Sequence, residues 1–216
     1  MSENHELPAR SAQPFLKAPW PVTALVGALL VAYGLQSLLP QEQILPRWAF
    51  SGASLRAGHW EVTLSAIFLH GSWAHVLMNA GGALAFATPV ARCFGPAGRG
   101  VAGFFVFYLL CGALANLAHL AIDPEGTSLL VGASGAISAM MGASACIVGG
   151  RGRPGSIFSP PVLSLGGGWL AVNLLVAVLG LAPGLGGGAI AWDVHLAGFV
   201  IGVLLIGPLV RLFAPR

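Results

Sequence analysis

The stretch LLVGASGAISAMMGA, residues 129–143, is almost wholly apolar, yet it holds a serine, Ser134, between Gly132 and Gly135. Two interpretations are open. Either the small residues let helices pack closely, or Ser134 takes part in chemistry. A lone serine in an apolar helix is usually a packing or helix-bonding residue. The rest of the chain has to decide between these two interpretations.

The composition is that of a membrane protein. The chain has 216 residues, of which 56% are hydrophobic and 8% are charged, whereas soluble domains carry about 25% charged residues. So few charges cannot cover a water-exposed surface, so we expect an integral membrane protein in contact with the lipid bilayer. The net charge of +3 is too small and too scattered to indicate a nucleic-acid partner. The three cysteines, Cys93, Cys111 and Cys146, lie in or beside apolar runs and read as buried thiols.

Six apolar segments are candidates to span a membrane, which takes about 20 residues per helix. The first is longer than the core of a signal peptide and lacks a clear cleavage site, so we interpret it as a retained anchor. We predict an all-α, six-helix membrane domain over residues 20–213, after a polar tail over residues 1–19. The fourth segment is short, as expected for a helix that begins below the membrane surface. The segments are 21–39, 73–91, 101–122, 133–148, 162–181 and 194–210.

The basic residues indicate how the spans are oriented. Cytoplasmic loops carry an excess of Lys and Arg, and six spans put both termini on one side. That side receives eight basic residues and the other side receives two, Arg47 and Arg56. We therefore expect both termini to be cytoplasmic. The long outer loop between the first two spans also holds Trp48 and Trp60, which suits an element in the headgroup layer. A simple exposed loop is equally compatible.

In this topology the second, fourth and sixth segments all run from outside to inside, so their first turns share one layer. His75 and Asn79 begin the second segment, Ser134 begins the fourth and His195 lies near the start of the sixth. Histidine is the usual base that activates a serine hydroxyl near neutral pH. His75 and Asn79 are four residues apart and share one helix face, so both can donate to a developing oxyanion.

Each of these residues also has a less specific explanation. A membrane histidine serves equally well in a proton relay, and Asn79 alone is typical of interhelical hydrogen bonding. The constellation, rather than any single residue, favours catalysis. Gly198 and Gly202 form a G-x-x-x-G pattern that predicts close helix packing, which would bring His195 near the helix that begins at Ser134.

Several further polar residues have weaker interpretations. His119 has no evident partner in the sequence. His70 could line the mouth of a cavity, but we interpret it as an interfacial residue. Asn173 reads as an interhelical contact. Asp193 precedes His195 by two positions, which points the two side chains apart on a helix, so we do not assign it as a triad acid. The His and acidic residues are too scattered for a zinc site, and we expect no metal.

Three motifs in order resemble the rhomboid intramembrane serine proteases. GASG at 132–135 resembles the family's G-x-S-G nucleophile motif, HVLMN at 75–79 resembles its H-x-x-x-N, and HLAGFVIG at 195–202 resembles its histidine helix. The resemblance covers roughly residues 20–213. It implies a bacterial-type protein of the inner (cell) membrane that cleaves single-span membrane proteins at helix-destabilising segments, without a cofactor.

The resemblance also implies roles for individual residues. Ser134 is the implied nucleophile and His195 the general base of a dyad without a third acid. The implied oxyanion-stabilising group comprises His75, Asn79 and backbone N–H groups at the start of the serine helix, where Gly132 and Ala133 precede Ser134. The sequence departs from the family pattern at Ser138, where many members carry an aromatic residue that packs against the histidine. It also carries Arg47 and Trp48 in the reverse of the common order.

Three classes of function fit these observations to different degrees. An active intramembrane serine protease leads. A catalytically silent rhomboid-like protein that binds membrane helices is the alternative, but such relatives usually lack the serine or the histidine, and this chain keeps both. A channel or proton-coupled transporter is disfavoured because the predicted spans lack acidic residues and no internal repeat is found.

Overall fold

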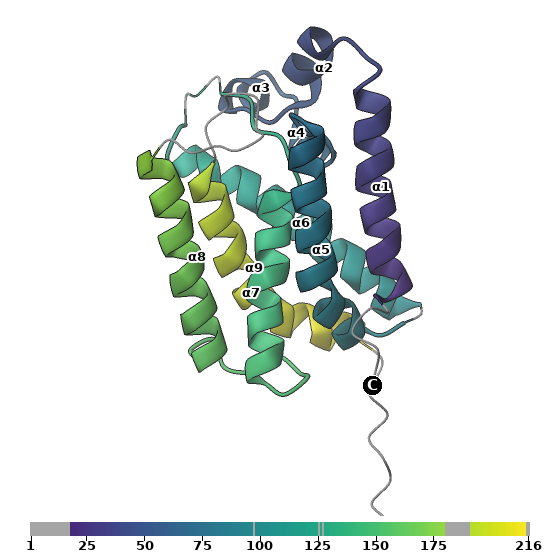
Figure 1. Ribbon diagram of the computed structural model, residues 1–216, viewed down its shortest axis with the longest axis vertical. Helices are drawn as coiled ribbons and strands as arrows, with labels where there is room; N and C mark the ends of the chain where they lie inside the picture. Colours follow the sequence, from purple (N-terminus) through teal and green to yellow (C-terminus); the bar gives the residue numbers. More distant parts are fainter. Residues whose placement is uncertain (1–17, 97, 125, 127, 180–190, 215–216) are drawn as a thin grey trace, which may run out of the picture.

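The computed structural model describes residues 18–96, 98–124, 126, 128–179 and 191–214. These residues form a bundle of apolar helices that run side by side (Figure 1). Four of the helices are long and apolar enough to cross a membrane, and α1 and α7 are shorter apolar helices. The expected all-α membrane fold is confirmed, whereas a count of six spans stays a prediction. The bundle helices are α1 (Trp20–Gln36), α5 (Trp73–Phe94), α6 (Arg99–Ala118), α7 (Ser134–Gly149), α8 (Pro160–Leu179) and α9 (Trp192–Phe213).

The helix boundaries lie close to the predicted segments, and two of the differences occur at charged residues. α5 begins at Trp73 as expected but continues past Arg92 to Phe94, because the long stem of an arginine can stay on the helix while its charge reaches water. α9 begins two residues early and includes Asp193 in its first turn, where an acidic group is favourable against the helix dipole. Residues 180–181 of the fifth segment, and residues 1–17 of the predicted tail, lie outside the described residues.

Helix α7 is the centre of the bundle. Thirteen of its sixteen residues are buried, and it packs against α5, α6, α8 and α9. Its closest neighbour is α9. A Cβ atom added at Gly198 would collide with the carbonyl oxygen of Gly135, and one added at Gly202 would collide with that of Ala139. The predicted close packing of the G-x-x-x-G helix is therefore confirmed, and its partner is the helix that begins at Ser134.

A group of short helices, the helical cap (residues 37–72), covers one end of the bundle (Figure 1). It contains α2 (Gln41–Trp48), α3 (Gly52–Arg56), α4 (Val62–Ser65) and the 3-10 turn η1 (Ala66–Phe68). A second 3-10 turn, η2 (His119–Ala121), extends α6 at the same end. The cap has a small apolar core of its own, formed by Phe50, Leu55, Val62 and Ala66.

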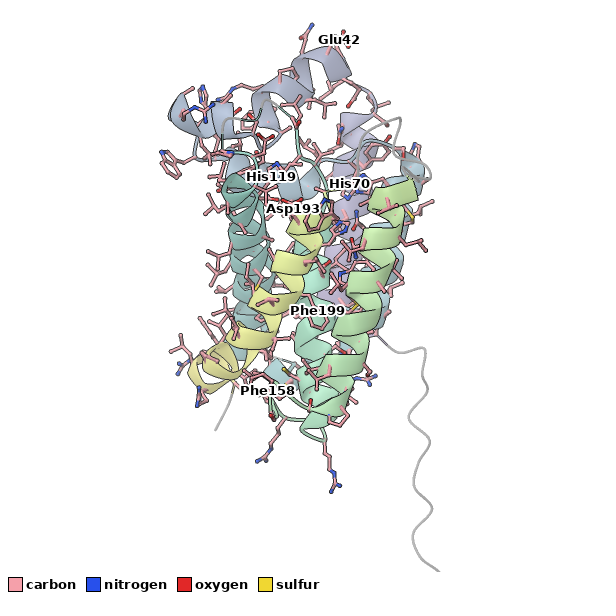
Figure 2. The ribbon with its side chains drawn as sticks, turned by 90° about the vertical axis from the view of Figure 1, so that its left-hand side faces the viewer. Glu42, His70, His119, Phe158, Asp193 and Phe199 are labelled. Carbon is pink, nitrogen blue, oxygen red and sulfur yellow. The ribbon has the colours of Figure 1, made fainter. Side chains whose placement is uncertain are left out.

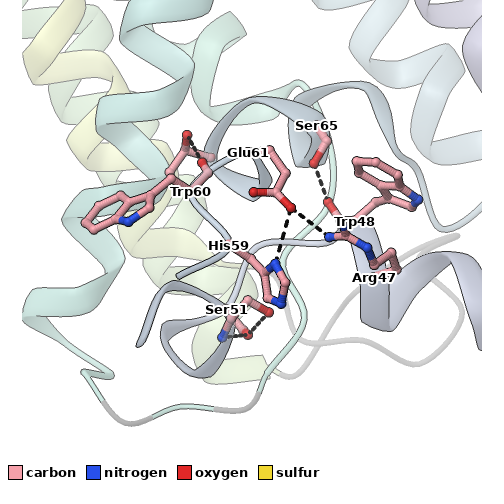
Figure 3. A network of polar contacts seen from close by, with 9 residues as sticks. Arg47, Trp48, Ser51, His59, Trp60, Glu61 and Ser65 are labelled. Atoms are coloured by element: carbon pink, nitrogen blue, oxygen red, sulfur yellow. Dashed lines mark hydrogen bonds and ion pairs between the residues drawn. The ribbon is translucent and has the colours of Figure 1, made fainter. Parts of the chain in front are cut away.

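Polar contacts on the surface of the cap tie its turns together (Figure 3). Arg47 Nη1 lies 2.7 Å from Glu61 Oε1, and His59 Nδ1 lies 3.3 Å from the same oxygen. The hydrogen bond from Arg47 lowers the pKa of the Glu61 carboxyl below its usual value. The guanidinium of Arg47 also lies over the ring of Trp48, 4.6 Å from its centroid. The long loop predicted between the first two spans is therefore folded and internally paired.

Candidate active site

The segment before α7 is held against the cap, which fixes where α7 begins. The Phe50 N–H donates to the Leu130 carbonyl at 3.0 Å, and the Leu130 N–H donates to the Phe50 carbonyl at 2.8 Å. The Gly132 N–H donates to the carbonyl of Ala66 at 2.9 Å. Gly132 has φ of +120°, a conformation that glycine adopts readily and other residues do not. Ser134 follows as the first residue of α7.

Ser134 and His195 are in hydrogen-bond contact. The distance from Ser134 Oγ to His195 Nε2 is 2.8 Å, although the two residues are far apart in the sequence. His195 lies in the first turn of α9, where its N–H donates to the Ala191 carbonyl at 3.3 Å. The contact follows from the small residues between α7 and α9, because a bulkier interface would hold the two helix starts apart.

His75 and Asn79 face the same place from α5. Ser72 caps this helix by accepting the N–H of His75 at 3.1 Å, as serine commonly does at a helix N-terminus. A Cβ atom placed on Gly132 would lie 2.7 Å from His75 Nε2 and 3.7 Å from Asn79 Nδ2. Among the described residues, Nδ2 of the buried Asn79 has no hydrogen-bond partner. Two side-chain nitrogens therefore converge beside Gly132, the first residue of the serine motif.

A cavity of about 540 Å³ joins these groups, within the usual range of about 300–1,000 Å³ for small-ligand sites. Its lining is mainly apolar, with a few convergent polar side chains. The sequence comparison with the rhomboid motif placed Ala133 in the oxyanion-stabilising group. In the structure Ala133 is fully buried and does not line the cavity. The predicted residues that line the cavity are His75, Asn79, Gly132, Ser134 and His195.

The imidazole of His195 has two neighbours on α8 that the sequence interpretation did not assign to the site. Nδ1 lies 2.8 Å from Asn173 Oδ1, and the ring of Trp169 lies 5.7 Å away, tilted by 34°. Asn173 was interpreted only as an interhelical contact. The sequence did offer one indication of this contact, because Asn173 is the single amide side chain in the predicted fifth span. Polar groups in membrane helices are costly and usually paired.

The structure shows what surrounds the small residue at position 138. Ser138 is buried, and a Cβ atom added at Gly198 would lie 3.3 Å from its Cβ. Ser138 therefore lies where α7 and α9 approach closely, and it also lines the cavity that contains Ser134 and His195. The aromatic neighbour of His195 is Trp169, which is contributed by a different helix.

His119 also has a partner that the sequence did not reveal. Its Nδ1 lies 2.5 Å from Asp193 Oδ2, and both side chains are largely shielded from solvent. Figure 2 labels both residues near the cap end of the bundle. The contact joins η2 to the first turn of α9, two residues before His195. The available indication was the predicted topology, because six spans would put the end of the third and the start of the sixth on the same side of the membrane.

The interpretation of His70 as an interfacial residue stays a prediction, and the structure adds that its side chain is fully buried within the protein. Its backbone is held from α1, where Gln36 Nε2 donates to the His70 carbonyl at 2.8 Å and Gln36 Oε1 accepts the His70 N–H at 3.0 Å. The ring of His70 meets that of His75 edge to face, with centroids 5.0 Å apart. His70 therefore supports the helix start that carries His75.

No group of three His, Cys, Asp or Glu side chains in the described part of the chain is placed to hold a metal ion. The fold and the site together define a helical membrane protein with a serine–histidine pair in a cavity among its helices. Residues 57–212 match the Rhomboid domain family. Because the match spans well over half of the chain, this protein belongs to the rhomboid family, whose members are generally intramembrane serine proteases. No individual curated protein matches the chain.

Proposed function

We propose that this protein is an intramembrane serine endopeptidase in which Ser134 is the nucleophile and His195 is the general base. The observation that carries the proposal is the 2.8 Å contact between Ser134 Oγ and His195 Nε2, made inside a cavity. A serine hydroxyl is a weak nucleophile until an adjacent base accepts its proton, and this geometry meets that requirement. The silent rhomboid-like alternative is disfavoured because both residues are retained and in contact.

The proposed reaction proceeds in two stages. Ser134 Oγ forms a bond to the carbonyl carbon of the scissile peptide while His195 Nε2 takes the hydroxyl proton, and the carbonyl electron pair moves to oxygen. When this intermediate collapses, the C–N bond breaks and the leaving amine takes the proton from His195. A water molecule then attacks the acyl ester, with His195 again as base, and Ser134 Oγ recovers its proton as the carboxylic acid product leaves.

The oxyanion is stabilised by donors from two helices. We assign this role to the side chains of His75 and Asn79 and to the backbone N–H of Ser134. In the described residues α7 has no side-chain N-cap, which leaves backbone donors of its first turn available. The Gly71 N–H points at His75 Nδ1 over a long 3.5 Å. That contact favours the proton on Nε2, the nitrogen nearer to Gly132.

The proposed substrates are membrane proteins with helix-destabilising transmembrane segments. A peptide bond in a regular helix cannot reach the serine without local unwinding, because its backbone groups are paired within the helix. The excess of basic residues at the end of the bundle opposite the cap supports an orientation with the cap outside and the termini in the cytoplasm. Cleavage would then occur near the outer end of the substrate helix, and we place the protein in the inner (cell) membrane of a bacterium.

The proposal is tested with purified protein in detergent and a fluorophore-labelled single-span membrane substrate. We expect cleavage by the native chain and none by Ser134→Ala or His195→Ala, while both variants keep the native thermal unfolding midpoint. A fluorophosphonate should label Ser134, as mapped by mass spectrometry. Undiminished cleavage by Ser134→Ala, or labelling confined to another serine, would refute the assignment. Binding of the labelled helix without any cleavage would favour the silent alternative.

A further inference from the structure

A general base of this kind works only when its ring is held in one orientation and one tautomer. His195 Nε2 must present a lone pair to Ser134, so the proton of the neutral ring must be on Nδ1. Free imidazole does not enforce this arrangement. In serine hydrolases a third residue fixes it by accepting a hydrogen bond from Nδ1. The family resemblance implies a dyad for this chain, so the group that fixes the tautomer of His195 has to be found in the structure.

The orientation of the Asn173 amide is set by its own helix. Asn173 Nδ2 donates to the carbonyl oxygen of Trp169 at 2.8 Å, one turn earlier in α8. A flipped amide would place Oδ1 against that carbonyl, where two acceptors would repel each other. Nδ2 is therefore held on the carbonyl, and Oδ1 is the atom that faces His195 Nδ1 at 2.8 Å.

This orientation determines the proton positions along the chain of hydrogen bonds. Because Asn173 Oδ1 can only accept, the His195 Nδ1–H must donate. Nε2 then carries no proton and accepts the hydroxyl of Ser134. From these contacts we propose that Asn173 is a positioning residue that fixes the tautomer and orientation of His195, so that the site is a Ser134–His195–Asn173 arrangement. This inference rests on the proposed protease function.

The surroundings of Asn173 favour an amide over a carboxylate in this role. Asn173 is buried, at 3% exposure, on the candidate span that is least buried within the protein. A neutral amide costs far less to bury there than an ionised acid. Trp169, one turn before Asn173, adds a ring contact to the same imidazole. α8 thus holds His195 by one hydrogen bond and one aromatic contact.

A merely structural role for Asn173, as a link between α8 and α9, makes different predictions. It predicts a loss of stability in proportion to any loss of activity, and no change in the His195 ring. A positioning role predicts a loss of kcat with little change in KM, together with a change of tautomer. We therefore compare Asn173→Leu, which has a similar shape and no acceptor, with Asn173→Asp, which keeps an acceptor oxygen. Leu174→Ala, at the next and more exposed position of α8, is the control.

The test measures kcat and KM on the labelled single-span substrate, the rate at which a fluorophosphonate labels Ser134, and the ¹⁵N shifts of the His195 ring. For Asn173→Leu we expect kcat to fall by about 10–10²-fold, less than the roughly 10⁴-fold loss when an ionised triad acid is replaced. The Nδ1-protonated signal should give way to the Nε2-protonated one. Asn173→Asp keeps an acceptor for Nδ1 but buries a charge and turns its second oxygen towards the Trp169 carbonyl, so it should recover only part of the rate. Leu174→Ala should stay within about twofold of the native chain.

The inference is overturned if Asn173→Leu keeps native kcat, or if its loss of activity is matched by unfolding and Asn173→Asp restores nothing. If Asn173→Leu does not fold, Asn173→Ala is judged by the same outcomes. Failure of the proposed function is recognised separately, because then Ser134→Ala still cleaves or Ser134 is never labelled. The ring ¹⁵N signals do not depend on activity, and an unprotonated Nδ1 in the native protein rejects the inference by itself.

Discussion

Asp193 Oδ2 lies 2.5 Å from Nδ1 of His119, so the first turn of α9 contacts η2, the turn that follows α6 (Figure 2). Both side chains are largely shielded. Hydrogen bonds to charged groups contribute about 1.5–3 kcal/mol. We expect Asp193→Ala to lower the free energy of unfolding by about that amount, as measured by thermal or denaturant unfolding in detergent. A double-mutant cycle with His119→Ala should show strong coupling, and additive effects would contradict the pairing.

The glycines between α7 and α9 should tolerate no side chain. A Cβ atom at Gly198 would meet the carbonyl oxygen of Gly135, and overpacking of this kind costs about 1–3 kcal/mol. Gly198→Ala is therefore expected to lower the unfolding midpoint and to reduce cleavage by separating His195 from Ser134. The matched control is Gly167→Ala in α8, where a Cβ meets nothing within 4 Å. A native midpoint for Gly198→Ala would contradict the close approach.

Gly132 should be required for activity for two reasons, its positive φ and the lack of room for a side chain beside His75. Gly132→Ala adds a methyl group 2.7 Å from His75 Nε2 to a positive-φ position, which itself costs about 1–2 kcal/mol. Gly152→Ala has the same backbone cost, at φ of +101°, but its Cβ meets nothing within 4 Å. We expect similar unfolding midpoints for both variants and a loss of cleavage only for Gly132→Ala. Equal cleavage activities of Gly132→Ala and Gly152→Ala would contradict the role assigned to His75 as an oxyanion donor.

Asn79 is expected to act on turnover rather than on binding. Asn79→Ala removes one oxyanion donor, so kcat should fall by at most about 10²–10³-fold while KM changes little. Asn79→Asp keeps the shape but brings an acceptor and a charge towards the oxyanion, and should be slower still. Steady-state kinetics with the labelled substrate separate the two constants. Native kinetics in Asn79→Ala would count against the assigned role.

His70 should make the fold sensitive to mild acid. Burial, together with repulsion from the ring of His75, lowers the pKa of His70 from 6.5 to about 4. Between these values the unfolded chain binds a proton at His70 and the folded chain does not. Stability is therefore complete above pH 6.5 and falls as the pH approaches about 4, by a few kcal/mol at most. Unfolding midpoints measured across this range should fall less in His70→Gln than in the native chain.

Several features followed from the sequence alone because they depend on composition and local pattern. Six apolar runs predicted the bundle helices, and their starts and ends were close to those observed. The order of the motifs brought Ser134, His195, His75 and Asn79 to one layer, since alternate spans run in the same direction. The G-x-x-x-G pattern at Gly198 predicted close packing. Each of these inferences needs only the period of a helix and the thickness of a membrane.

Other features were decided only by the tertiary structure. Contacts of Asn173 with His195, of Asp193 with His119 and of the segment 129–132 with the cap depend on how helices rotate about their axes. The rotation of each helix about its axis is set by its packing against all of its neighbours, and the order of residues along the sequence does not reveal it. The sequence determined that this chain is a membrane bundle with a serine and a histidine at one depth. The packing of α8 against α9 decided what holds the histidine, because Asn173 reaches His195 only in that arrangement.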